Sequence, residues 1–317
     1  MEKNLVNRIE MTVDNYRIAK EYLRNDGDIL NHFASLVFTH YEKEIPVERV
    51  KEIRKYIKST TTRMSAFRGD TLYMLSLLIA TIDQENQINL IEDIYESMKL
   101  LEEQGFDVGS YLVLTAYVIS RYNKLRSKRE IVTKIKEIYI ILKEKYSNIT
   151  NEDDYLLCAL WVINNVQADT VDDFIENVFE HIANSNIRSK NGVQGLANAI
   201  MLNGSSGDMY RSIEFILQLE KRNIKIAYQF LPLIGILTSY NPRKYVDIVE
   251  GVIEYLCDEE FEYECYLDKG FRTVIAIAIV SFCTACDKKR YIDELLAQGI
   301  VSFIKSKNKG IFEGVVN

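Results

Sequence analysis

Six apolar segments recur along the chain at nearly even intervals, and this repetition constrains the fold more than any other feature of the sequence. Each segment has a small residue near its middle, and successive small residues are 38 to 44 positions apart. A helical hairpin of about 40 residues cannot bury its apolar face alone, so the repeat predicts hairpins that stack on their neighbours. The segments begin at Leu72, Tyr111, Tyr155, Val193, Phe230 and Thr273, and their small residues are Ser76, Thr115, Ala159, Ala197, Gly235 and Ala276.

A second helical pattern follows each of the first five segments. Residues 89–106 and 131–146 are clear examples, with apolar residues at i, i+3, i+4 and i+7 and charged residues between them. This spacing places the apolar residues on one face of a helix and leaves the other face in water. The preceding segment is apolar almost all round, so we expect it to be covered on several sides. Each unit is therefore predicted to be one sheltered helix followed by one surface helix.

These patterns predict an all-α fold in which the hairpins stack as an open α-solenoid, with a closed, α/α toroid-like ring as the alternative. The chain has only 3 prolines and 14 glycines in 317 residues, which favours helices over strands joined by tight turns. Residues 1–66 are helical in pattern but off the repeat, so we interpret them as an N-terminal cap. Residues 67–317 would then form about six units in one continuous domain.

The charge and the apolar runs exclude several classes of partner. The net charge is −7, so binding to nucleic acid as a whole-surface property is not expected. The first residues are charged and lack the apolar core of a signal peptide. The longest uncharged run, residues 273–286, is too short to cross a bilayer. We therefore expect a cytoplasmic protein that does not bind membranes.

Residues 65–72, SAFRGDTL, open the first regular unit and contain the tripeptide RGD. Our preferred interpretation is a helix start, with Gly69 in the turn, Asp70 or Thr71 as the N-cap and Phe67 packed back on the helix. A role in adhesion is disfavoured because no export signal is evident. Arg68 could instead bind a carboxylate or phosphate, or pair with an acidic side chain of the N-terminal region.

The histidines and cysteines do not suggest a cofactor. His32 and His40 are two helical turns apart, so one metal ion cannot easily take both, and we expect each histidine to be hydrogen-bonded or exposed. Cys283 and Cys286 form a CxxC pair, but a zinc site commonly has two such pairs. We interpret the thiols as core residues, while metal binding by this pair stays open. The five cysteines are Cys158, Cys257, Cys265, Cys283 and Cys286.

Aromatic and charged clusters complete the candidate binding features. Tyrosines at the starts of the apolar segments, with Trp161 deeper in, are expected to pack between units or to anchor a peptide. The basic segment 121–145 could be a solvated face or a docking patch for an acidic partner such as a second copy. The acidic run 258–264 is interpreted as solvated helix starts. The speculative ligand- or peptide-binding set is Arg68, Asp70, Tyr111, Asp154, Tyr155 and Trp161.

Several of these residues also resemble a known family. The Phe67-Arg68-Gly69 turn, Gly105-Phe106, the helix that starts at Tyr111 and the Asp153-Asp154-Tyr155 helix start together resemble a bacterial family of helical proteins, domain of unknown function four thousand and three. The resemblance covers roughly residues 10–240 and weakens after that. This family has no assigned activity, so the resemblance implies a cytoplasmic bacterial protein and no catalytic residue.

The sequence contains no catalytic motif, which argues against an enzyme and favours a scaffold that binds a protein or peptide on its inner surface. The alternative is an enzyme or small-ligand binder with a pocket at one end of a helical ring. A structural homo-oligomer is the third hypothesis.

Overall fold

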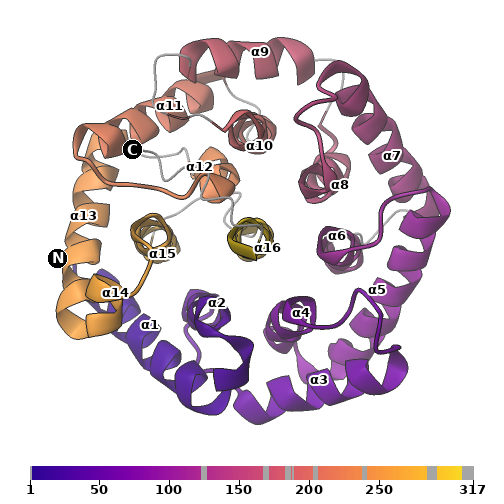
Figure 1. Cartoon of the computed structure of the whole chain (residues 1–317), viewed down its shortest axis with the longest axis horizontal. Helices are drawn as coiled ribbons and strands as arrows, with labels where there is room; N and C mark the ends of the chain where they lie inside the picture. Colours follow the sequence, from indigo (N-terminus) through magenta and orange to yellow (C-terminus); the bar gives the residue numbers. More distant parts are fainter. Residues whose placement is uncertain are drawn as a thin grey trace. The chain divides into compact units, whose positions relative to one another are not determined.

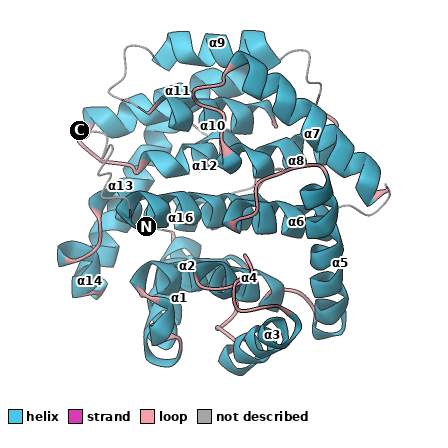
Figure 2. Ribbon diagram, turned by 45° about the vertical axis from the view of Figure 1, so that its right-hand side comes forward, coloured by secondary structure: helices cyan, strands magenta, loops and turns pink. Residues whose placement is uncertain are grey.

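The structure is a computed structural model that describes residues 2–122, 127–166, 171–182, 187, 189–202, 206–237, 241–283 and 291–308. These residues form sixteen α-helices and no β-strand (Figure 2). The prediction of an all-α fold is therefore confirmed. The finer choice between an open solenoid and a closed ring stays a prediction.

The chain divides into two compact units. Unit 1 combines residues 1–45 with residues 170–317, and unit 2 is residues 46–169. The predicted boundary between an N-terminal cap and the repeats, after residue 66, falls inside unit 2 and stays a prediction.

Unit 2 contains three sheltered helices and three surface helices. In Figure 1 α4, α6 and α8 lie side by side as one layer, and α3, α5 and α7 form the other. The first layer is buried along nearly its whole length, and the second is buried on one face only. Burial thus confirms the predicted alternation in this unit. The helices are α3 (Val47–Thr60), α4 (Asp70–Ala80), α5 (Gln84–Glu103), α6 (Ser110–Tyr122), α7 (Lys128–Lys145) and α8 (Tyr155–Asn164).

Helix boundaries in both units follow local chemistry. Gly105, at φ +73°, ends α5 in the left-handed conformation that glycine adopts without steric cost. The Asn241 side chain accepts hydrogen bonds from Arg243 N (3.2 Å) and Lys244 N (3.4 Å), and Pro242 occupies the first helical position of α13. Gly105 therefore fixes the end of α5, and Asn241 with Pro242 fixes the start of α13.

Unit 1 joins the first and last helices of the chain. Helix α1 packs against α13 and α15, and α2 packs against α15 and α16, as the indigo and the orange to yellow ribbons in Figure 1 show. Units of an open solenoid contact only their sequence neighbours, so this contact departs from that pattern. The helices are α1 (Lys3–Tyr22), α2 (Asp28–His40), α9 (Val171–Ile182), α10 (Lys190–Met201), α11 (Ser206–Lys221), α12 (Leu231–Ile236), α13 (Pro242–Glu259), α14 (Phe261–Cys265), α15 (Lys269–Phe282) and α16 (Ile292–Asn308).

Helices α10 and α12 approach each other closely at Gly235, one of the small residues of the repeat. A Cβ at this position would lie 2.7 Å from Ala199 Cβ and 2.9 Å from the Leu196 carbonyl oxygen. Protein interiors are close-packed, so no space remains for a side chain between these two backbones. Gly235 is therefore required because α10 and α12 lie too close together for any side chain at this position.

Candidate docking surface

The side chain of Arg68 caps the C-terminal end of helix α3. Its Nε donates to Thr62 O (2.9 Å), and its Nη2 donates to Lys58 O (2.8 Å) and to Thr61 O. The last carbonyls of a helix have no partner within the helix, so these bonds complete the end of α3. Arg68 makes no bond to an acidic side chain of the described residues, and its binding of an outside anion stays a prediction.

The predicted N-cap of α4 is wrong. Gly69, at φ +61°, occupies the N-cap position, and no side chain caps the helix. Asp70 is exposed in the first turn, while Thr71 Oγ1 donates to Ser110 Oγ at 2.8 Å. Phe67 is buried with its ring edge-on to Tyr95 of α5, at 5.0 Å between centroids. This segment is therefore fixed by Gly69 and by contacts with other helices.

Replacing Arg68 tests its structural role. We expect Arg68→Ala to lower the free energy of unfolding by about 1 to 2 kcal/mol, because several carbonyl oxygens lose a charged donor that water replaces only in part. The exposed Arg63 makes no hydrogen bond within the described residues, so Arg63→Ala is the matched control and should change stability little. Urea unfolding followed by circular dichroism measures both, and equal effects would contradict the role of Arg68.

The other four predicted residues of unit 2 belong to its core and caps. Tyr155 is buried edge-on against Phe106 (4.8 Å) and Tyr139 (4.9 Å), and burial raises the pKa of Tyr155. Asp154 Oδ2 accepts from the Asn151 backbone N–H at 3.0 Å in a capping box. Tyr111 and Trp161 are also buried. Arg68 donates to the carbonyl oxygens at the end of α3, Asp70 is exposed, and a role of the set in peptide binding stays a prediction.

A different feature stands out in unit 1, on the short helix α14 and its C-cap residue Tyr266. Phe261 is 60 % exposed and Tyr266 is 77 % exposed, and their rings meet edge to face at 5.7 Å and 75°. Single exposed apolar residues are ordinary, but adjoining exposed aromatic rings are typical of interaction sites. We define Phe261 and Tyr266 as the aromatic pair.

A buried tyrosine between these two residues fixes α14 to the rest of unit 1. The Tyr263 ring is buried 6.0 Å from Tyr16 of α1 and 5.1 Å from His32 of α2. Arg272 of α15 donates to the Tyr263 carbonyl oxygen at 2.8 Å. Three helices therefore hold the centre of α14.

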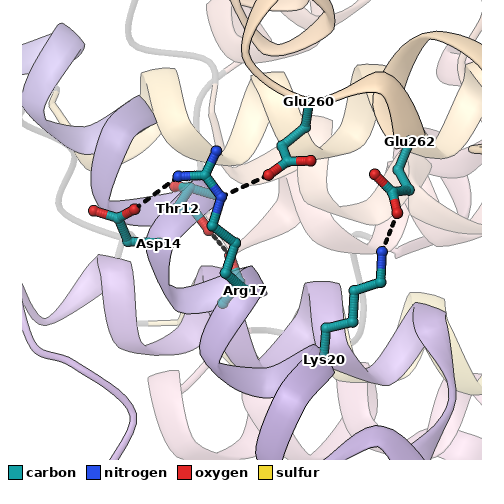
Figure 3. A network of polar contacts seen from close by, with 7 residues as sticks. Thr12, Asp14, Arg17, Lys20, Glu260 and Glu262 are labelled. Carbon is teal, nitrogen blue, oxygen red and sulfur yellow. Dashed lines mark hydrogen bonds and ion pairs between the residues drawn. The ribbon is translucent and has the colours of Figure 1, made fainter.

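Two ion pairs add to this attachment (Figure 3). Arg17 Nε donates to Glu260 Oε1 at 2.6 Å, and Lys20 Nζ donates to Glu262 Oε1. The hydrogen bond from Lys20 lowers the pKa of the Glu262 carboxyl, and the bond to Glu260 raises the pKa of Arg17. Exposed pairs contribute about 0 to 1 kcal/mol each, so they orient α14 more than they stabilise it.

The segment of the chain that carries the aromatic pair is negatively charged. The run 257–266 contains five carboxylates and no cationic residue. Glu260 and Glu262 are neutralised by α1, but Asp258, Glu259 and Glu264 are exposed and form no ion pair within the described residues. The interpretation of the acidic run as solvated helix starts leaves out the aromatic residues that alternate with the acids.

His32 lies beneath α14 and is unusual for a buried histidine. Its ring stacks on Tyr16 at 4.0 Å and 3°, and neither ring nitrogen has a hydrogen-bond partner within the described residues. Its Nε2 is 3.7 Å from Asp28 Oδ2, beyond hydrogen-bond distance, and Asp28 Oδ1 accepts from Tyr16 OH at 2.6 Å. Burial lowers the pKa of His32 to about 4. The prediction of a hydrogen-bonded or exposed histidine is wrong at this position.

His40 is hydrogen-bonded, as predicted. Its Nδ1 lies 3.0 and 3.1 Å from the two carboxylate oxygens of Asp293, and its ring stacks on Phe282 at 4.7 Å. The exposed His181 also has a partner, Asn177 O, at 2.7 Å. In a neutral imidazole, a carboxylate that accepts from Nδ1 selects the tautomer with the proton on that nitrogen.

The described residues contain no group of three metal-ligating side chains. Cys158, Cys257, Cys265 and Cys283 form no disulfide with one another, and burial raises the pKa of Cys158. The predicted pair of Cys283 with Cys286 cannot be placed, because Cys286 lies outside the described residues.

A small apolar depression lies in unit 1 between α11, α12 and α13. Phe215, Ile234 and Tyr245 line it, together with Ser212, whose buried Oγ has no hydrogen-bond partner within the described residues. It has room for about one water molecule, so it does not fit an organic ligand.

Among the described helices, none combines the length and the hydropathy needed to span a bilayer. No curated protein and no solved structure matches the chain. A family model matches residues 15–309, which extends well past the region where the resemblance was noted from the sequence. The chain, with its helical units and its Phe67-Arg68-Gly69 turn, belongs to the family described as "Protein of unknown function (DUF4003)".

Proposed function

We propose that this chain binds another protein, and that the aromatic pair on α14 is the anchor of the binding surface. The observation that carries the proposal is the exposure of Phe261 and Tyr266 on a helix whose centre is fixed by the buried Tyr263. Aromatic side chains dominate the binding energy of many protein interfaces, because they bury a large area at a small cost in side-chain entropy.

The attachment of α14 supports the proposal. Binding is weakened when a surface must be ordered in the complex, so a surface that is already held in place binds more tightly. Tyr263, the ion pair of Arg17 with Glu260 and the ion pair of Lys20 with Glu262 hold α14 in place before a partner arrives.

The inner-surface version of the scaffold hypothesis has less support. Helices α4, α6, α8, α10 and α15 are buried along nearly their whole length, so they offer few side chains to a peptide. We therefore assign the protein-binding role to α14 and not to the sheltered helices.

Removal of the aromatic pair tests this function. We expect the double variant F261S/Y266S to capture at least about tenfold less partner protein than wild type, because two anchor residues are removed. Native lysate of the encoding organism would be passed over immobilised protein and the bound proteins quantified by mass spectrometry. The control is Tyr210→Ser, which removes a tyrosine of α11 that is 55 % exposed and should leave capture unchanged. Identical capture by wild type and double variant would refute the proposal, provided that urea unfolding shows equal stability.

A second function, acid–base chemistry on a small ligand, rests on His40 and Asp293. Asp293 is buried and holds Nδ1, and Nε2 has no partner within the described residues. A general base needs this arrangement. We rank it second because a buried aspartate needs a hydrogen-bonded partner for stability alone.

A further inference from the structure

The surface around the aromatic pair carries charge that unit 1 does not neutralise. Asp258, Glu259 and Glu264 are exposed and have no cationic partner within the described residues, whereas Glu260 and Glu262 are paired with α1. Clusters of one sign of charge favour a partner of the opposite sign and increase its rate of association.

The aromatic pair adds a second preference for cations. The faces of Phe261 and Tyr266 carry the negative part of the ring quadrupole, and a guanidinium or ammonium group within about 6 Å of a ring centroid is attracted to it. Arg and Lys side chains also have apolar stems that can pack on exposed rings. Exposed rings that lie within three positions of these carboxylates in the chain therefore suit a cationic side chain better than an apolar one.

We infer that the segment that docks on α14 is a cationic stretch of a partner protein, with Arg or Lys side chains that stack on Phe261 and Tyr266 and pair with Asp258, Glu259 and Glu264. This inference rests on the proposed function and specifies the chemistry of the partner.

A second copy of the chain fits this surface less well. Two copies that met through α14 would bring together carboxylates of the same sign. Two of the cations of the basic helix α7 are already engaged within unit 2. Lys128 pairs with Asp93 (2.6 Å) and Glu96 (2.5 Å), and Lys143 donates to Thr150 O at 2.6 Å. Nucleic acid is disfavoured by the charge of the surface.

Fluorescence anisotropy with short labelled peptides tests the inference on the full chain. One peptide alternates Arg and Leu, a second has citrulline in place of every Arg, and a third has Glu. We expect the Arg peptide to bind at least about tenfold more tightly than the citrulline peptide. Its affinity should fall about tenfold between about 50 and about 500 mM salt, because salt screens the charges. The Glu peptide should not bind.

Variants assign the binding to α14. We expect F261S/Y266S to abolish binding of the Arg peptide and D258N/E259Q/E264Q to weaken it at least about fivefold. The matched control E102Q/E137Q/E144Q removes three exposed carboxylates of unit 2 and should leave binding unchanged. The exposed Cys265 offers an independent readout, because a bound peptide should slow its reaction with a thiol reagent.

The outcomes separate this inference from the proposed function. Equal binding of the Arg and citrulline peptides, lost in F261S/Y266S, would overturn the cationic partner and leave α14 as a docking site. Failure of every peptide to bind would also overturn the cationic partner. The proposed function would then be tested separately, by capture from lysate. A mass increase in sedimentation that F261S/Y266S abolishes would identify a second copy as the occupant and overturn it too.

Discussion

Acidification from pH 7 to pH 4 is expected to lower the free energy of unfolding by about 3 kcal/mol through His32 alone. Burial lowers the pKa of His32 from 6.5 to about 4 in the folded protein. Below pH 6.5 the unfolded chain binds a proton that the folded chain does not, so stability falls as the pH falls. Above pH 6.5 the residue is neutral in both states and contributes no pH dependence.

Comparison of variants isolates this effect from the carboxylates that titrate in the same range. His32→Phe keeps an aromatic ring on Tyr16 and removes the titrating group, so its stability should fall less steeply between pH 7 and pH 4 than that of wild type. His181→Gln removes an exposed histidine and should behave like wild type. Urea unfolding at several pH values measures all three proteins. Parallel curves for wild type and His32→Phe would contradict this, because they would mean that His32 binds its proton equally well in the folded and unfolded states.

Gly235→Ala is expected to lower the free energy of unfolding by about 1 to 3 kcal/mol, because the added methyl group forces α10 and α12 apart. The new Cβ would meet the Leu196 carbonyl oxygen at 2.9 Å and Ile200 N at 3.0 Å, and backbone atoms cannot move aside as a flexible side chain can. The separation of the two helices would also weaken the packing around them.

Gly109→Ala provides the matched control for this substitution. A Cβ at Gly109 meets only Glu152 Oε2 within 4 Å, at 3.6 Å, which is an ordinary contact, so the variant should stay within about 0.5 kcal/mol of wild type. Thermal and urea unfolding of the two variants give the comparison. A Gly235→Ala protein as stable as Gly109→Ala would mean that α10 and α12 can separate without loss of packing.

Local periodicity was sufficient to predict the helices, because a helix that is apolar all round and one that is apolar on one face leave different patterns in the sequence. Helices α4 and α5 follow this rule from end to end. Contacts between distant segments were not predictable in the same way. The packing of α1 and α2 against α13, α15 and α16 depends on how whole helices meet, and no short pattern records it.

Individual side chains were harder to predict where tertiary packing overrides a local preference. Asp70 has a residue type that favours N-caps, yet Gly69 takes the position and Asp70 stays exposed. His32 is polar, but stacking on Tyr16 holds it in the core without a hydrogen bond. A five-residue helix is too short to show periodicity, so the exposure of Phe261 and the burial of Tyr263 could not be distinguished from the sequence.

The attachment of α14 to α1 has a practical consequence for the choice of fragments. Arg17 and Glu260 are 243 positions apart in the chain, yet they meet in one ion pair, and Tyr16 contacts the same short helix. A recombinant piece that begins after Tyr22 would leave Glu260, Glu262 and Tyr263 without these neighbours. A fragment that keeps the whole C-terminal half but lacks α1 would therefore lose the contacts that hold Phe261 and Tyr266 in place. Truncations and affinity tags at the N-terminus should be chosen so that α1 stays intact.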